Sequence, residues 1–267
     1  MDFTELCKTL SRMFDIDTEG YKENQLKRRI EHLIHTQGFQ GYEDYIGALK
    51  TDQKQRELFL DRLTINVSEF FRNANAFEVL EKRVLPALLK TKKKLKIWSA
   101  ACSNGAEPYS VAIILKEISP LVNHQIDATD IDKKILEVAK TGCYKKELLK
   151  NVPPQRLKKY FVETNNLWCL GDEIKEKVKF RQHDLLKNDF PSGYDLIICR
   201  NVAIYFNRES QKKLYEKFFC SLNDEGILFT GATEYILNHK ELGFEIIYPW
   251  FYKKQKGLRS IENHGFY

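Results

Sequence analysis

The chain has 267 residues, of which 43% are hydrophobic and 30% are charged, as in an ordinary soluble globular protein. Its net charge of +6 is weak evidence for a nucleic-acid partner and fits an acidic protein partner equally well. Charged residues interrupt every apolar run near the N-terminus, and no run reaches the roughly 20 residues that span a bilayer. We therefore expect a cytoplasmic protein without a signal peptide or membrane insertion.

The six cysteines are scattered, and no two of them form a Cys-x-x-Cys pair. Metal sites and disulfide frameworks usually need tighter clusters, so we expect no bound metal. Several cysteines lie in apolar segments, such as Cys199 at the end of the run 196–199. The sequence therefore predicts buried, reduced thiols, as is usual in a reducing compartment.

Residues 1–90 are predicted to form a small all-helical domain. An apolar stripe recurs there at helical spacing and is followed by glycines that end the helix: Leu26, Ile30, Leu33, Ile34, Gly38 and Gly41. Further helices are expected over residues 55–63 and 75–85. The second should end near Pro86, because proline interrupts the helical hydrogen-bond ladder.

From residue 91 to 257 strand-like and helical segments alternate, which indicates an α/β domain with a doubly wound parallel sheet. The expected strands cover residues 96–101, 125–130, 178–182, 196–199 and 226–230. Two aromatic segments at 244–248 and 251–254 are predicted to form an antiparallel edge.

Residues 145–177 do not fit this alternation. Two apolar runs at 160–163 and 167–170, joined by Asn165 and Asn166, predict a β-hairpin. We interpret the segment as a small β-subdomain inserted into the α/β domain. The last residues, 258–267, are predicted to form a disordered tail.

Ligands of an open parallel sheet bind beyond the carboxyl ends of its strands, so the residues there are candidates for a site. The loop 101–108 contains one glycine, Gly105, instead of the three of a dinucleotide-binding loop. This disfavours a nicotinamide-dependent oxidoreductase. It fits a nucleoside cofactor without phosphates that approaches the backbone at Gly105, although an ordinary strand-to-helix turn has the same pattern.

Polar residues also follow the later strands. Asp130 could accept hydrogen bonds from both hydroxyls of a ribose, or it could cap the following helix. Asp184 is a similar candidate, for which a simple turn is an equal alternative. Arg200 and Asn201 follow a very apolar strand, where such side chains are costly unless they meet water, a ligand or a partner. The alternative for Arg200 is a salt bridge that only ties elements together.

Four segments, in order along the chain, resemble the signatures of the CheR chemotaxis receptor methyltransferase family. They are LTINVSEFFR at 63–72, IWSAACSNGAEPYS at 97–110, ATDID at 128–132 and CRNVAIYF at 199–206. The segment GATE at 231–234 resembles the one after that family's late strand. The resemblance implies a helical N-terminal domain, a Rossmann-like domain that binds S-adenosylmethionine, and a small β-subdomain.

By this resemblance, S-adenosylmethionine would be held by Asn66, Ser68, Arg72, Glu107, Asp130, Asp184, Leu185, Asn201 and Val202. Three positions depart from the family's pattern. Ala106 replaces a common second glutamate, Ser68 replaces a frequent threonine, and Asp184 replaces a frequent asparagine. Ser68 keeps the hydroxyl, whereas Asp184 replaces an amide that donates and accepts by a carboxylate that only accepts.

The implied reaction methylates glutamate side chains of chemotaxis receptors and leaves S-adenosylhomocysteine. A glutamate with a reference pKa of about 4.3 is ionised at pH 7, so the reaction needs no general base. The site's tasks are positioning and desolvation. We hypothesise that Arg72 and Tyr205 line the methyl-transfer end and orient the carboxylate; Arg72 could instead hold the methionyl carboxylate of the cofactor.

A basic helix with Lys22, Arg28 and Arg29 is a candidate docking face for the acidic helical bundle of a receptor, and a solvated helix face is the alternative. We expect no nucleic-acid partner, since amino-methylating enzymes of that class carry Asp/Asn-Pro-Pro-Tyr/Phe where this chain has RNVA at 200–203. A catalytically silent cofactor-binding module is a further alternative. The expected oligomeric state is a monomer.

Overall fold

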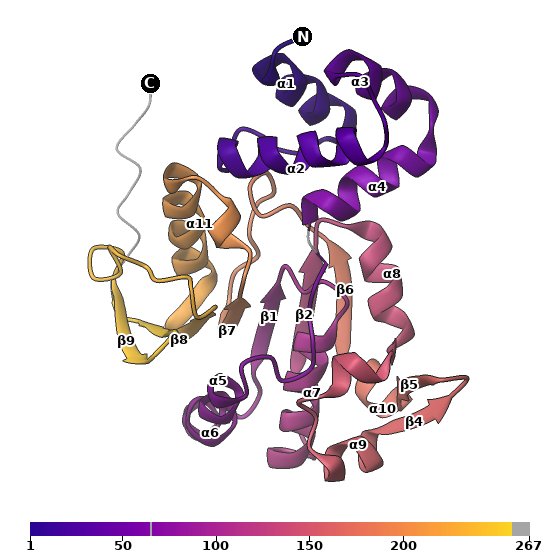
Figure 1. Ribbon diagram of the computed structural model, residues 1–267. Helices are drawn as coiled ribbons and strands as arrows, with labels where there is room; N and C mark the ends of the chain where they lie inside the picture. Colours follow the sequence, from indigo (N-terminus) through magenta and orange to yellow (C-terminus); the bar gives the residue numbers. More distant parts are fainter. Residues whose placement is uncertain (65, 258–267) are drawn as a thin grey trace.

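The computed structural model describes residues 1–64 and 66–257. Four helices form an N-terminal layer at one end of a large sheet (Figure 1): α1 (Phe3–Phe14), α2 (Glu23–Thr36), α3 (Tyr42–Thr51) and α4 (Gln53–Thr64). The apolar stripe predicted for α2 is confirmed, because its four residues are buried in the core of this layer. That core is separate from the two hydrophobic clusters that cover the sheet.

A long helical segment leads from this layer to the sheet. It consists of α5 (Ala74–Val79), the π-helical turn η1 (Leu80–Val84) and α6 (Leu85–Thr91). The prediction that the helix ends near Pro86 is wrong. Pro86 directly follows the π turn, in which the amide of Leu85 donates to the carbonyl of Leu80. A π turn is wider than a turn of α-helix, so the helix can continue past a proline, whose ring clashes with the preceding turn of a regular α-helix and which has no N–H to donate.

The sheet is mixed, as predicted. Its strands are β1 (Lys96–Ala100), β2 (Gln125–Asp130), β6 (Val178–Gln182), β7 (Tyr194–Cys199), β8 (Leu222–Thr230), β9 (Phe244–Tyr248) and β10 (Phe251–Lys254). They follow the order β6-β2-β1-β7-β8-β10-β9, in which the first five are parallel and the last two pairings are antiparallel. The order reverses between β1 and β7, where a doubly wound sheet opens a crevice for a ligand.

Alternate side chains of the central strands enter two different cores. Ile97, Leu196 and Ile198 pack in the cluster that contains α5, α6 and α7 (Ala106–Ile118). Trp98 and Ile197 pack in the cluster that contains α11 (Arg208–Ser221). Both faces of the sheet are therefore covered, which explains why β7 is buried at every position. Helix α8 (Lys133–Thr141) lies beside β2 and β6 (Figure 1).

A small second sheet extends from the main domain. Its strands are β3 (Cys143–Tyr144), β4 (Phe161–Thr164) and β5 (Leu167–Leu170), in the order β3-β5-β4. The predicted hairpin is thus confirmed. Strand β3 was not predicted, because its two residues are too short to form a recognisable pattern. The short helices η2 (Lys146–Leu149), α9 (Pro154–Tyr160) and α10 (Asp172–Lys175) complete this region.

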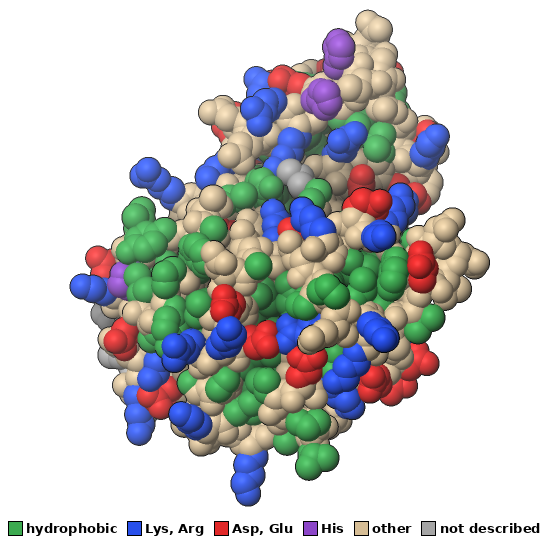
Figure 2. Space-filling model, turned by 60° about the horizontal axis from the view of Figure 1, so that its bottom comes forward, with side chains coloured by type: hydrophobic (Ala, Val, Ile, Leu, Met, Phe, Trp, Pro, Cys, Tyr) green, Lys and Arg blue, Asp and Glu red, His purple; other side chains and the backbone are tan. Residues whose placement is uncertain are grey.

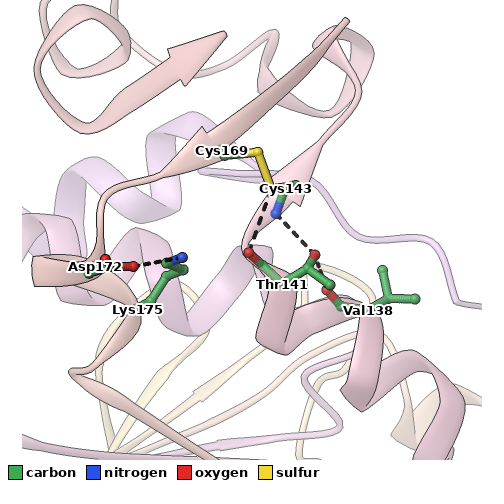
Figure 3. Close-up of a disulfide and its surroundings, with 6 residues drawn as sticks. All are labelled: Val138, Thr141, Cys143, Cys169, Asp172 and Lys175. Carbon is green, nitrogen blue, oxygen red and sulfur yellow. Dashed lines mark hydrogen bonds and ion pairs between the residues drawn. A yellow bond between two sulfur atoms is a disulfide. The ribbon is translucent and has the colours of Figure 1, made fainter. Parts of the chain in front are cut away.

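The prediction of six reduced thiols is wrong. Cys143 and Cys169 form a disulfide between β3 and β5 (Figure 3). The two residues are direct cross-strand partners although they lie 26 positions apart, a pairing that depends on strand register and not on sequence spacing. Of the remaining cysteines, Cys7, Cys102 and Cys199 are buried as predicted, whereas Cys220 is exposed.

Charges of both signs are interspersed on the surface. The face in Figure 2 shows Lys and Arg side chains alternating with Asp and Glu among the described residues. Within residues 1–64 and 66–257, no helix combines the length and apolar character needed to cross a membrane.

Candidate functional site

A cleft lies beyond the carboxyl ends of β1, β2, β6 and β7, next to the helical layer. Its walls come from the loops after these strands, from residues 67–72 and from Tyr21 and Leu63 of the helical layer. The cleft holds about 1110 Å³ of non-protein space, part of which is open solvent.

Asp130 ends β2 and faces the cleft. Its carboxylate accepts hydrogen bonds from the backbone N–H groups of Ser103, at 2.7 Å, and Asp132, at 3.1 Å. The side chain is buried, and burial raises the pKa of Asp130 to about 6. The cap of α8 is Asp132, whose side chain accepts from the N–H groups of Lys134 and Ile135. Asp132, and not Asp130, is therefore the cap of this helix.

Glu107 reaches the cleft from the first turn of α7. The hydroxyl of Ser99 donates to its Oε1 at 2.7 Å, and Nη1 of Arg200 lies 3.4 Å from its Oε2. Burial raises the pKa of Glu107 even with this cationic partner nearby. A second carboxylate thus stands in a largely desolvated wall of the cleft.

Arg200 combines both roles considered for it. Its Nη2 donates to the carbonyl of Arg72 at 3.1 Å and to Oδ1 of Asn73 at 2.6 Å. Its guanidinium carbon lies 4.7 Å from the centre of the Phe229 ring. Arg200 lines the cleft, its ion pair with Glu107 ties β7 to α7, and its two other hydrogen bonds tie β7 to the segment before α5.

Four buried polar atoms in the cleft wall have no hydrogen-bond partner among the described residues. They are Oγ of Ser103, Nε2 of His183, Oδ2 of Asp184 and Nε of Arg200. Burial lowers the pKa of His183 to about 4 and raises the pKa of Asp184. Unpaired polar atoms are costly in a buried wall unless a ligand or water pairs with them. This arrangement fits a cofactor with hydroxyl and amino groups.

Residues 67–72 contribute to one wall of the cleft; Ile65 lies outside the described residues. Ser68 and Arg72 line the cleft, and Nη1 of Arg72 donates to the carbonyl of Val67 at 3.0 Å. The segment is anchored to α7 and to the loop before it. Nδ2 of Asn104 donates to the carbonyl of Ser68 at 3.1 Å, and the amide of Phe71 donates to Oγ of Ser110 at 3.0 Å.

The helical layer also holds the loop that carries Tyr205. The guanidinium of Arg29 lies over the Tyr205 ring, 4.2 Å from its centre, and its Nη1 donates to the carbonyl of Leu63 at 3.1 Å. The amide of Lys22 donates to the carbonyl of Tyr205 at 2.8 Å. Arg29 is therefore half-buried at the cleft, whereas Arg28 is exposed.

Comparisons with known proteins agree with this architecture. The model described as the all-alpha domain of CheR methyltransferase matches residues 1–64, and the model described as its SAM binding domain matches residues 66–248. This chain belongs to the CheR methyltransferase family. Its fold therefore consists of the family's helical domain followed by a Rossmann-like methyltransferase domain that binds S-adenosylmethionine.

Curated relatives share almost the whole chain. A chemotaxis protein methyltransferase of Listeria innocua is 38% identical over 254 residues, which cover 95% of this chain and 97% of that protein. Chemotaxis protein methyltransferase 1 of Pseudomonas aeruginosa is 34% identical and covers 89% of this chain and 91% of its own length. The chemotaxis protein methyltransferase of Escherichia coli K12 is 30% identical, with coverages of 87% and 83%. The predicted family and fold are thus confirmed, and so is the assignment to chemotaxis methylation.

Nine of the eleven residues predicted from the CheR motifs for the cofactor or catalysis line the cleft. They are Ser68, Arg72, Glu107, Asp130, Asp184, Leu185, Asn201, Val202 and Tyr205. Asn66 is not among the lining residues; its Nδ2 donates to Asp132 at 2.7 Å and ties the linker to α8. These placements bring the predicted residues together, while the role of each one stays a prediction.

Gly105 also lies outside the lining of the cleft. It precedes α7 with a φ of 83°, which favours glycine. A Cβ atom there would lie 3.0 Å from Cβ of Ala139 and 3.1 Å from Cζ of Phe180. The turn and the tight packing against α8 and β6 therefore explain why residue 105 is a glycine.

Sequence reasoning missed several lining residues. Ser103 and His183 follow β1 and β6, so their positions at strand ends were a usable signal. Tyr21 enters from the helical layer, where its ring packs edge-on against Phe206 with centres 5.3 Å apart. No local sequence pattern predicts this contact, because it depends on how the helical layer packs against the sheet domain.

Proposed function

We propose that this CheR-family protein transfers the methyl group of S-adenosylmethionine to glutamate side chains of chemotaxis receptors. The products would be glutamate methyl esters and S-adenosylhomocysteine. The observation that carries the proposal is the cleft, in which residues from four CheR motifs gather around two buried carboxylates, Glu107 and Asp130. Membership in a family of chemotaxis methyltransferases supports the same reaction.

The cleft residues divide the binding of the cofactor among them. The carboxylate of Asp130 would accept the ribose hydroxyls, and Glu107 would pair with the amino group of the methionyl part. Asp184 would accept from an amino donor through its unpaired Oδ2. Ser68, Leu185, Asn201 and Val202 complete the wall.

When bound, S-adenosylmethionine supplies a methyl group on a positively charged sulfonium. The substrate glutamate is ionised at neutral pH and acts as the nucleophile without a general base. Negative and positive charge cancel toward the transition state, so a cleft that excludes water lowers the barrier relative to water. Arg72 and Tyr205 would orient the carboxylate at the mouth, although a tight ion pair with Arg72 would weaken the nucleophile.

The proposed partner is the helical bundle of the receptor's cytoplasmic part, and the enzyme would act in the cytoplasm as a monomer. Arg28, at the exposed face of α2, would contact acidic residues of the bundle together with Lys22. Arg29 is already engaged with Tyr205, so it would act mainly by supporting the cleft.

The test is transfer of tritiated methyl from S-adenosylmethionine to membranes that contain chemoreceptors, followed by mild alkali. We expect protein-bound label that alkali releases as methanol, the signature of a carboxyl methyl ester. Alkali-stable label would indicate another acceptor atom. Cofactor binding in calorimetry without any transfer would support the alternative of a silent binding module.

A further inference from the structure

Glu234 is a buried carboxylate just after β8 that accepts four backbone hydrogen bonds. Its Oε2 accepts from the amides of Asn201, at 2.6 Å, and Gly231, at 2.8 Å. Its Oε1 accepts from the amides of Val202, at 2.9 Å, and Ala203, at 2.8 Å. Only 4% of the residue is exposed, and no Lys or Arg of the described chain forms an ion pair with it.

Three of these four donors belong to the loop that follows β7. Asn201 has a φ of 61°, the left-handed region that costs free energy for a residue with a Cβ. The next residues, Ala203–Tyr205, form the short helix η3. Asn201, Val202 and Tyr205 all line the cleft. A carboxylate that binds three consecutive amides therefore fixes the turn from which these side chains enter the site.

We propose that Glu234 is a positioning residue of the methyltransferase site. It does not line the cleft itself and acts through the backbone of residues 201–203. Its negative charge holds the loop in the conformation that presents Asn201 and Val202 to the cofactor and Tyr205 to the methyl-transfer end. This inference rests on the part of the proposed function that assigns S-adenosylmethionine to the cleft, and not on the receptor as substrate.

Gly231 supports the same arrangement from the other side. A Cβ atom on Gly231 would overlap with Oε2 of Glu234, and it would approach the amide nitrogen of Asn201 to 3.0 Å. Any larger residue must therefore displace the carboxylate from the loop. Gly231→Ala and Glu234→Gln should disturb the same contacts by different means.

The charge and symmetry of the carboxylate are essential to this contact. Each oxygen accepts from two amides, so Glu234→Gln places an NH₂ group against two N–H donors whichever way the amide turns. Hydrogen bonds to a charged group are stronger than those between neutral groups. The variant keeps the size of the side chain and removes its ability to hold the loop.

Asp195→Asn is the control. Asp195 lies near the opposite end of β7, is equally buried, forms an ion pair with Lys92 and accepts from the amide of Lys96 at 2.9 Å and from Nδ2 of Asn223 at 2.7 Å. It takes no part in the cleft. Its substitution should lower the melting temperature and leave the affinity for S-adenosylmethionine within about twofold, because it removes buried hydrogen bonds far from the site.

The experiment measures the Kd for S-adenosylmethionine by calorimetry and the hydrogen exchange of amides 201–203 in the full-length protein. We expect Glu234→Gln and Gly231→Ala to raise the Kd by about 10- to 100-fold and to speed exchange at these amides. The double variant should show less than the sum of both effects. If Glu234→Gln does not fold, Gly231→Ala carries the test.

Two results would overturn the inference. One is an unchanged Kd and unchanged exchange at 201–203 in the folded variants. The other is an equal rise of the Kd in Asp195→Asn, which would reduce Glu234 to a general stabilising residue. Both readouts are independent of the receptor, so a failure to methylate receptors would contradict the proposed function and leave this inference to be judged separately.

Discussion

At Asp130 the demands of stability and of ligand binding oppose each other. Burial raises its pKa from the usual 3.8 to about 6. Between these values the native protein without ligand binds more protons at this carboxyl than the unfolded chain does. The free energy of unfolding therefore falls as the pH rises through this range. A ligand that donates hydrogen bonds to the ionised carboxylate reverses part of this loss.

We predict that the affinity for S-adenosylmethionine rises as the pH increases from about 5 to about 7.5, because the ribose hydroxyls favour the ionised form of Asp130. Burial also raises the pKa of Glu107 and Asp184, so the comparison with Asp130→Asn isolates one group. This variant should bind more weakly and show a flatter pH profile in calorimetry. An identical pH profile in the variant would contradict the role of Asp130.

Arg72 is partly exposed at the cleft and makes one hydrogen bond to its own segment, through Nη1. We predict that Arg72→Ala lowers turnover by about 100-fold, a loss typical of misplaced substrate, and changes the melting temperature only slightly. The control is Arg181→Ala, which replaces an exposed arginine outside the cleft and should keep full activity. Wild-type turnover in Arg72→Ala would rule out its catalytic role.

Single residues at the ends of parallel strands were the most predictable part of the site. Asp130, Asp184 and Asn201 could be chosen because any ligand of such a sheet approaches there. Glu234 and Tyr21 could not be assigned roles in this way. Glu234 acts on a loop more than thirty positions before it, and Tyr21 enters from a different layer, so both depend on tertiary contacts.

Among the elements, the segments with a clear period were predicted best. The stripe of α2 and the continuous apolar run of β7 follow from burial on one side or on both. The predicted end of the helix at Pro86 was wrong. The helix continues past the proline through a π turn, which has no sequence signature. Strand β3 has only two residues and is defined by its partner β5.

The contribution of the disulfide to stability can be tested separately. It joins β3 to β5 and closes a loop of 26 positions, which predicts a contribution of about 3 kcal/mol to the free energy of unfolding. We expect a reducing agent to lower the melting temperature of the wild type and to have no effect on Cys169→Ser. Equal melting temperatures of the two proteins without reductant would show that the bond does not stabilise the fold.

At the scale of the whole molecule, the site exists only because two layers meet. The sheet supplies the strand ends, whereas Tyr21 and Leu63 of the helical layer form part of the opposite wall. An antiparallel bridge between Tyr21 and Phe206 and the contact of Arg29 with Tyr205 join the layers beside the cleft. The sequence predicted both layers, but their relative placement required the structure.

The two arginines of the predicted docking face should therefore behave differently. We predict that Arg28→Glu raises the apparent KM for the receptor several-fold in low salt and less in high salt, because an exposed charge is screened. Its affinity for the cofactor should not change. Arg29→Glu should lower kcat at every salt concentration, since it removes the support of Tyr205. An unchanged KM in Arg28→Glu would identify a merely solvated helix face.

The most direct measurement of the central claim is mass spectrometry of a receptor's cytoplasmic fragment after incubation with the protein and S-adenosylmethionine. We predict peptides heavier by one methylene group, with fragment ions that place the added mass on glutamate side chains, and far fewer such peptides with Arg72→Ala in the same incubation time. Methyl groups on lysine or arginine, or none at all with a protein that binds the cofactor, would contradict a glutamate methyltransferase.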